Sequence, residues 1–395
     1  MDVVVVGGGI VGLSSAYYLG RAGAEVTLCE RDALGTRSTA RSAGGIRSQF
    51  STEVNVRLSL ASREVWDAFE ADFGVDVAHR RHGYLLLARE EATASRFREH
   101  VAMQNDLGVG SEYLSPAEAA ERCPELHDDR FVGATYHADD GYADPNLAVQ
   151  GYAAAARESG VDVRTRTEVT DVLTDGADGR AAPERGTDEP TVTGVETADG
   201  RIEADRVVNA AGAWAARLAA MVGVDLPIRP RRRQIAVVEP GVTLPGDVPL
   251  TIDLDACSYF RPEREGAALV GGHFAAADPD VDPDRYSKSL DLDWAATAVE
   301  RAADCADYFG ADSRIKSGWA GLYAVTPDHH PVIEETLPGL VTAAGFSGHG
   351  FQHAPATGKL VAELCVDGGA SLVDVDPLSS RRFEEGGRLV ERNVA

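Results

Sequence analysis

Residues 2–12 read Asp2-Val3-Val4-Val5-Val6-Gly7-Gly8-Gly9-Ile10-Val11-Gly12, and this stretch decides the fold. Its unbroken β-branched run predicts a strand buried on both faces, as in the middle of a parallel sheet. Gly7 permits a tight turn, Gly9 lets backbone approach a pyrophosphate, and Gly12 lets the next helix pack against the strand. The apolar spacing predicts that this helix ends near Gly23.

The next strand, residues 25–30, ends in an acidic residue. Glu30 follows Gly7 by twenty-three residues, where a dinucleotide-binding fold places the carboxylate that binds ribose. Strand, glycine turn, helix, strand and acid in this order predict a Rossmann-type domain with an ADP-containing cofactor. A purely structural glycine turn would leave the acid unexplained.

Residues 35–47, GTRSTARSAGGIR, favour FAD over NAD. They supply small hydroxyls, backbone amides and arginines where a second loop can reach the pyrophosphate and the edge of the isoalloxazine. An NAD domain seldom needs such a loop. An ordinary polar turn is the alternative interpretation.

Composition limits the class of protein. The 395 residues are 44% hydrophobic and show no repeat, which allows one large core or two interleaved domains. The formal charge is −25, and the lysines are Lys288, Lys316 and Lys359. Such an acidic, lysine-poor surface repels nucleic acid and anionic membrane, and it resembles the surfaces of halophilic proteins from salt-rich cytosols. An acidic face that binds a partner is the alternative.

Cysteine usage and hydropathy predict a soluble cytoplasmic protein. The five cysteines are scattered and form no C-x-x-C, so the sequence predicts neither a disulfide framework nor a metal or redox site. The first strand begins almost at Met1, which leaves no room for a signal peptide. No apolar run approaches the ~20 residues of a membrane span.

Further along the chain, helix signals are clear at three places. Residues 52–73 predict one amphipathic helix, Ser115 begins a helix of the capping-box kind, and Asp144-Pro145 begins another that ends at Gly160. A strand is expected around residues 82–87. The remaining expectations are strands near 161–172, 191–197 and 201–209, a mobile loop at 175–190, and alternating strands and turns over 225–319.

Two later segments repeat the form of a buried strand followed by glycine. Residues 207–214 indicate that the chain returns to the nucleotide domain. Residues 340–351 predict a strand and a glycine-rich turn before a helix at 353–366, whose N-terminal amides suit negative charge on a flavin ring. Between these segments, the basic run 229–234 either binds phosphate or, more simply, pairs with surface carboxylates.

These residues resemble the flavoprotein family of D-amino-acid oxidase, glycine oxidase and sarcosine oxidase. The resemblance is carried by residues 3–47, 140–145, 207–214 and 319–351, and it is strongest toward sarcosine oxidases and the β subunits of their multi-subunit relatives. It implies an α/β fold with a discontinuous Rossmann-type FAD domain and a second α+β substrate domain on a mostly antiparallel sheet. The expected FAD domain comprises 1–82, 145–220 and 320–395, and the expected substrate domain 83–144 and 221–319.

The resemblance also implies an activity. A small amine or amino acid would lose hydride from the carbon beside its nitrogen to FAD, and the imine would then hydrolyse. Arg47 resembles the arginine that binds the substrate carboxylate, while Tyr259 and His273 fall where the subfamily lines its pocket. Either of these two could instead be a hydrogen-bonded core residue. His349 and Gln352 complete the expected catalytic set.

Three departures from the family pattern are informative. Gln352 stands where the subfamily has a lysine that helps to bind carboxylate. The lysine that assists oxygen chemistry would fall near Leu269, so the acceptor is either oxygen or another electron acceptor. The tethering cysteine would fall at Gly321 and the tethering histidine at Arg41, which implies non-covalent FAD.

The motifs and the resemblance together give a set of candidate cofactor-binding residues. They are Gly7, Gly9, Ile10, Val11, Gly12, Glu30, Arg31, Ser38, Thr39, Arg41, Ser42, Gly44, Gly45, Val169, Ala211, Gly212, Trp214, Gly321, Gly345, Ser347, Gly348, His349, Gly350, Phe351 and Gln352.

Alternatives remain at this point. Adjacent His329 and His330 point to opposite sides of an extended segment, so Asp328-His329-His330 is not expected to bind metal. A 2-hydroxy acid could be the substrate if His273 took the hydroxyl proton. A third possibility is a flavin-carrying β subunit that is active only with partner subunits. The sequence does not name the substrate.

Overall fold

The computed structural model describes residues 1–175, 190–274, 277–384, 386 and 389–394. The molecule has two halves in space. One of them, called here the nucleotide half because it contains the N-terminal glycine turn, is built on a six-stranded sheet in which β1 lies between two parallel neighbours, β12 and β2. The β18 edge strand runs antiparallel to β19. The strands, in spatial order, are β18 (Val332–Leu337), β19 (Leu340–Ala344), β12 (Arg206–Asn209), β1 (Asp2–Val6), β2 (Glu25–Glu30) and β8 (Asp162–Thr165).

The valine run of β1 is buried on both faces, as the sequence predicts. Val3 and Val5 pack with Leu13 of the first helix, whereas Val4 and Val6 pack toward a small three-stranded sheet. That sheet consists of β11 (Gly200–Glu203), β10 (Val192–Thr197) and β9 (Val169–Thr174). The helices of this half are α1 (Ile10–Arg21), α2 (Glu53–Asp67), α3 (Phe69–Phe73), α6 (Pro145–Glu158), α7 (Ala215–Ala220) and α9 (Gly350–Val366).

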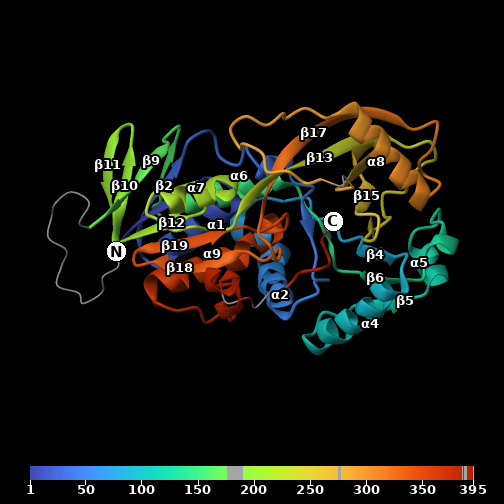
Figure 1. Ribbon diagram of the computed structural model, residues 1–395, viewed down its shortest axis with the longest axis horizontal. Coiled ribbons are helices and arrows are strands. Elements are labelled where there is room, and N and C mark those ends of the chain that lie inside the picture. The colour runs from blue at the N-terminus through green and yellow to red at the C-terminus, as the bar shows by residue number, and fades with distance from the viewer. Residues whose placement is uncertain (176–189, 275–276, 385, 387–388, 395) are drawn as a thin grey trace.

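The second half is an eight-stranded sheet in which all neighbours are antiparallel except β14 and β4. Figure 1 shows it beside the nucleotide half, with α8 over one face and α4 and α5 at the far end. In spatial order the strands are β17 (Arg314–Val325), β13 (Arg229–Glu239), β16 (Ala268–Gly272), β15 (Ser258–Pro262), β14 (Leu250–Asp253), β4 (Tyr84–Ala88), β6 (Gly133–His137) and β5 (Glu112–Leu114). The helices are α4 (Glu91–Asp106), α5 (Pro116–Arg122) and α8 (Leu292–Cys305).

A short ribbon joins the two halves near the site. Its strands are β3 (Gly45–Ile46) and β7 (Gly141–Tyr142), which pair antiparallel. The long strand β17 also crosses between the halves, so a domain boundary at residue 320 falls inside a continuous strand. None of the helices in the described part of the chain has both the length and the apolar character needed to cross a bilayer.

Most predicted helix ends are confirmed. Ser115 forms a reciprocal capping box with Glu118, and Asp144 caps α6 ahead of Pro145. The helix expected at 52–73 is instead two helices, because Ala68 leaves helical geometry at φ −97° and ψ 5°. The last helix begins at Gly350, not at residue 353.

Strand predictions need three corrections. The strand expected at 161–172 is β8 and β9, which lie in different sheets because Arg166 turns the chain with φ 57°. Likewise, 201–209 divides into β11 and β12. The stretch 225–319 contains α8, whose alanine-rich inner face packs on the large sheet. Most of the loop expected at 175–190 lies outside the described residues.

Candidate active site

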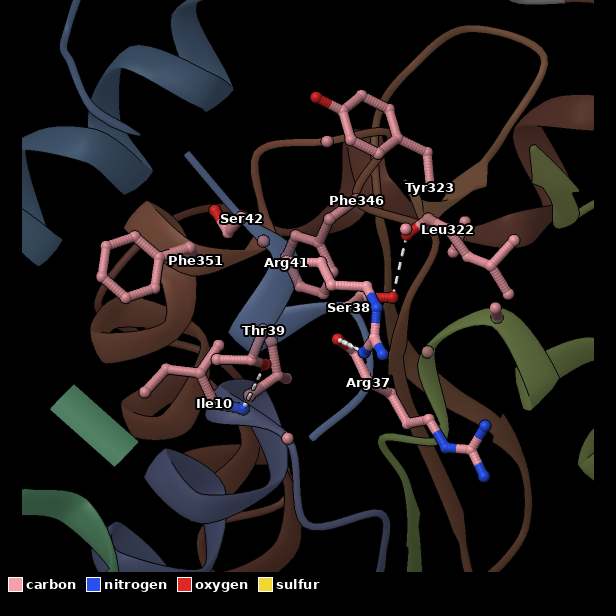
Figure 2. A pocket seen from close by; sticks show the side chains of 18 of the residues that line it. Ile10, Arg37, Ser38, Thr39, Arg41, Ser42, Leu322, Tyr323, Phe346 and Phe351 are labelled. Carbon is pink, nitrogen blue, oxygen red and sulfur yellow. Dashed lines mark hydrogen bonds between the residues drawn. The ribbon is translucent and has the colours of Figure 1, made fainter. Parts of the chain in front are cut away.

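A cavity of about 470 Å³ lies between the two halves of the molecule. One wall comes from the β1–α1 turn, the end of β2, the 35–47 loop and the turn before α9, while Tyr84, Tyr259 and Tyr323 come from the large sheet. Figure 2 shows Ile10 and Thr39 on one side and Leu322 and Tyr323 on the other. Every predicted cofactor-binding or catalytic residue lines this cavity except Gly12, Gly44 and His273.

The glycines of the first turn are required for close packing. A Cβ on Gly7 would lie 2.5 Å from the carbonyl oxygen of Ala210, and one on Gly12 would lie 1.9 Å from the carbonyl oxygen of Gly7. Gly12 therefore lets α1 approach the strand, as predicted, without facing the cavity. The Ile10 N–H at the start of α1 donates to Thr39 Oγ1 at 3.2 Å, which joins this turn to the 35–47 loop.

Glu30 stands at the end of β2 with its carboxylate at the cavity wall. The backbone N–H groups of Gly8 and Asp32 each donate to one of its oxygens at 2.7 Å. A carboxylate oxygen can accept a second hydrogen bond, so both remain able to bind ribose hydroxyls. The arrangement fits the adenosine part of FAD, whose ribose needs an acceptor at this point.

The 35–47 loop is fixed to both halves. Ser38 Oγ donates to the carbonyl of Leu322 at 2.8 Å (Figure 2). The Arg41 guanidinium donates to the carbonyls of Thr36 and Arg37 within the loop. Gly44 does not line the cavity. It packs against the backbone of Ala143 instead, so closely that an added Cβ would lie 2.0 Å from the Ala143 carbonyl oxygen.

The ribose end of the cavity carries a charged cluster that the sequence did not reveal. The Arg31 guanidinium lies 4.1 Å above the Trp214 ring and 2.9 Å from the Asp284 carboxylate. Asp284 also accepts from Trp214 Nε1 at 3.0 Å and from Arg217 at 2.7 Å. Asp284 and Arg217 escaped prediction because they belong to no recognisable motif.

Arg47 is buried at the cavity wall. Its side chain donates to the carbonyls of Gln49, at 2.9 Å, and Asn393, and its guanidinium lies 4.1 Å from the centre of the Phe50 ring. Among the described residues it forms no ion pair. Burial lowers the pKa of the Arg47 guanidinium, and the nearby carboxylates of Glu391 and Asp140 oppose that change.

The large sheet contributes a tyrosine wall, defined as Tyr84, Tyr259 and Tyr323. Burial raises the pKa of all three phenols, so they are neutral hydrogen-bonding groups near neutral pH. Tyr259 was predicted here, whereas Tyr84 and Tyr323 were not. Tyr323 could have been predicted from the sequence, because it stands two residues after Gly321, a predicted cofactor-binding residue, and alternate residues of a strand face the same side.

His349 and Gln352 lie at the start of α9. The Nε2–H of His349 donates to the carbonyl of His329 at 2.8 Å, and its Nδ1 lies 3.0 Å from Nδ1 of His353. Burial lowers the pKa of His349 to about 3, so the ring is neutral with both nitrogens engaged. The Gln352 side-chain oxygen accepts from the Arg47 backbone N–H at 3.0 Å.

His273 is not brought to the site. Gly272, at the end of β16, lines the cavity, and His273 follows the strand with Nε2 3.7 Å from the Asp278 carboxylate. Burial, and secondarily Arg233, lower its pKa. His273 therefore lies just beyond the end of β16 and does not line the cavity.

Two other polar segments are accounted for by internal contacts. The arginines of 229–234 lie on β13 and pair with aspartates 278, 280 and 291, although Arg233 also lines the cavity. Asp328 pairs with Arg382 at 2.7 Å, and His330 Nδ1 donates to the Asp328 carbonyl at 2.9 Å. Within the described part of the chain, no group of acidic, histidine or cysteine side chains forms a metal site.

The chain is similar to proteins that are already known. It is 33% identical to FAD-dependent oxidoreductase domain-containing protein 1 of Xenopus laevis, over 100% of this chain and 84% of that one. It is 28% identical to sarcosine oxidase subunit beta of Rhodobacter capsulatus, over 100% and 91%. The structure of L-proline dehydrogenase from P. horikoshii superposes with a TM-score of 0.86, at 32% identity and 98% coverage of both chains.

Residues 2–364 match the model of a single family, described as FAD dependent oxidoreductase. The match spans both halves of the molecule and includes the glycine turn, Glu30 and the turn before α9. With the cavity formed between these elements, it shows that the chain belongs to the FAD dependent oxidoreductase family and that FAD is its cofactor.

Proposed function

We propose that this enzyme oxidises the carbon–nitrogen bond of a small amine or amino acid whose carboxylate binds Arg47. One observation carries the proposal: a buried guanidinium lies at the cavity wall with no acidic partner among the described residues. Glu391 and Asp140 act on the guanidinium without forming an ion pair with it, so a substrate carboxylate would supply the direct partner that a buried charge requires.

The geometry of Arg47 suits that role. Two carbonyls, those of Gln49 and Asn393, accept from its terminal nitrogens, and Phe50 supports one face of the guanidinium. A guanidinium has five N–H donors, so donors remain for a planar carboxylate. Such pairs are often bidentate, which would fix the orientation as well as the position of the substrate.

The rest of the chain's part is orientation and exclusion of water. FAD, when bound, supplies the acceptor for the hydride. The tyrosine wall closes the cavity opposite the cofactor loops and offers neutral phenols to the substrate. Holding the substrate carbon in one place lowers the entropic part of the barrier.

The lining residues favour an amine over a 2-hydroxy acid. Oxidation of a hydroxyl needs a base near the reacting oxygen. His273, the expected base, does not line the cavity, and His349 lines it with both ring nitrogens engaged. A neutral amine carries its own lone pair and needs no such base. The similarity to a proline dehydrogenase and to a sarcosine oxidase subunit agrees with an amino-acid substrate.

The test is an anaerobic flavin-bleaching screen with glycine, sarcosine, D- and L-amino acids, proline and 2-hydroxy acids. For the substrate found, Arg47→Ala should lose about 2–5 kcal/mol of binding and transition-state stabilisation while FAD content stays intact. Arg47→Lys should recover part of the loss, since the bidentate fork is absent. The exposed Arg57, which pairs with Glu53, provides the control Arg57→Ala. Unchanged kinetics in Arg47→Ala would refute the role of Arg47.

A second arrangement is favoured by the similarity to a protein named as a subunit, sarcosine oxidase subunit beta. In that case the chain would bind FAD but turn over only with partner subunits. Gel filtration of the enzyme from its native host, followed by the same bleaching screen on the isolated chain, separates the two arrangements. Bleaching by the isolated chain would exclude the second.

A further inference from the structure

Residues 389–394 lie against the loop that carries Arg47. Figure 1 shows the C-terminal end of the chain between the two halves, near α2 and β4. The carbonyl of Asn393 accepts from the Arg47 guanidinium, and Asn393 Nδ2 donates to the Gln49 carbonyl at 3.1 Å. Val394 lines the cavity itself. A segment more than 340 residues away in sequence thus completes the surroundings of Arg47.

Glu391 fixes this segment in place. Its side chain is fully buried and accepts from Ser51 N and Oγ at 2.8 and 2.7 Å, Thr52 Oγ1 at 2.9 Å and Asn55 Nδ2 at 3.0 Å. The Asn393 N–H also donates to it, at 3.0 Å. One carboxylate therefore joins the Asn393 turn to the start of α2, directly after the Arg47 loop.

The opposite side of the loop is held in the same way. The Asp140 carboxylate accepts from Ser48 N at 2.8 Å and from Gln49 Nε2 at 3.1 Å. Two buried carboxylates thus hold the loop through its backbone, at Ser48 and Ser51, and within the described part of the chain neither accepts a hydrogen bond from the guanidinium. The loop is fixed while the charge of Arg47 stays free for a ligand.

We infer that Glu391 and Asn393 are positioning residues for carboxylate binding by Arg47. The inference rests on the proposed function, because Glu391 and Asn393 would influence substrate binding only through the position of the Arg47 side chain. Glu391 orders the Asn393 turn, and the Asn393 carbonyl then holds one terminal nitrogen of Arg47 at the cavity wall. Loss of this contact leaves the side chain free to leave the orientation that a carboxylate requires.

The test is a double-mutant cycle on the FAD-loaded enzyme, with acetate as the probe and the visible flavin absorbance as the readout. Glu391→Gln keeps the shape of the side chain but removes the charge that accepts these hydrogen bonds, and it should raise the Kd for acetate about tenfold. In the Arg47→Ala background the same substitution should change the Kd no further. Glu384→Gln makes the same charge change at an exposed site and should have no effect.

The outcomes separate the two hypotheses. An unchanged Kd in Arg47→Ala would refute the proposed function together with this inference. If Arg47→Ala weakens acetate binding and Glu391→Gln does not, or if their effects add independently, the positioning role alone is wrong. Should Glu391→Gln fail to retain FAD, Asn393→Ala takes its place in the cycle: it removes the Nδ2 hydrogen bond to the Gln49 carbonyl that helps to fix the same turn, with the same expected dependence on Arg47.

Discussion

Arg41 and Gly321 are packed directly against each other at the cavity wall: a Cβ added at Gly321 would lie 2.9 Å from the Cβ of Arg41. By resemblance, these are the two positions at which related enzymes carry a histidine or a cysteine that tethers the flavin. They come from the 35–47 loop and from β17, so the structure brings the two alternative tether sites together on one wall. Arginine does not form the covalent link to FAD that histidine or cysteine forms, and glycine has no side chain with which to form one.

The first prediction is therefore that FAD is released by acid or heat. The protein should be yellow, and after precipitation the flavin should appear in the supernatant, where chromatography should identify it as FAD. Flavin that stays with the precipitated chain would contradict this. Release of FMN would contradict the role of Glu30, because FMN has no adenosine ribose.

The second prediction concerns retention of FAD by Asp284. This residue comes from the segment after β16 and binds Arg31, Trp214 and Arg217 of the nucleotide half. Asp284→Asn should weaken that bridge, so FAD should dissociate faster, measured as recovery of flavin fluorescence on dilution. Asp280→Asn removes an aspartate that pairs with Arg231 and does not line the cavity, so it is the matched control. Equal dissociation rates in the two variants would contradict the prediction.

Local patterns were sufficient to predict the first strand–helix–strand unit of the nucleotide half. The β1–α1–β2 unit is confirmed to within two residues, because its strands, glycines and terminal acid each depend on neighbours a few residues away. Gly12 illustrates the same point: its contact is with Gly7, five positions earlier. Such short-range requirements are legible in a sequence.

Long-range contacts explain what the sequence did not reveal. Tyr84 reaches the site because β4 pairs with β14, and Glu391 does so because its carboxylate bonds to Ser51. His273 shows the converse, since a one-residue shift at a strand end decides which residue faces the cavity. The helix α8 was missed although its buried residues, Ala295, Ala298, Ala302 and Cys305, recur at helical spacing, because the whole stretch was interpreted as strands and turns.

The third prediction is that stability falls as pH falls below about 6.5. Burial lowers the pKa of His349 to about 3 and that of His353 well below its usual value. In the unfolded chain these rings take up protons near pH 6.5, whereas the folded rings do not. The unfolded state therefore binds more protons between pH 6.5 and 3, and each such histidine removes about 1.4 kcal/mol of stability per pH unit there.

His349→Gln tests this, because glutamine can donate to the His329 carbonyl without titrating. Urea unfolding followed by tryptophan fluorescence, at constant high salt, should show a shallower loss of stability between pH 6.5 and 5 than in the wild type. His137 acts in the opposite sense, because Asp140 raises its pKa. Its contribution is present below about pH 6.5 and is lost as the pH rises through the raised value. An identical slope in His349→Gln would contradict the prediction.

The last prediction is that stability depends steeply on salt. The chain carries 63 acidic and 38 basic residues, a net charge of −25, so its surface repels itself unless counterions screen it. Screening lengths grow from about 3 Å at 1 M salt to about 30 Å at 0.01 M, which exposes most surface carboxylates to one another. Exposed ion pairs such as Arg57–Glu53 strengthen at low salt but contribute little, typically under ~1 kcal/mol each. Repulsion should therefore dominate, and Tm should fall from molar to millimolar NaCl.

Sucrose at matched osmotic strength is the control, because it raises stability by exclusion without screening charge. A Tm that is flat in NaCl, or one that sucrose restores as fully as salt does, would show that the acidity is not an adaptation to salt.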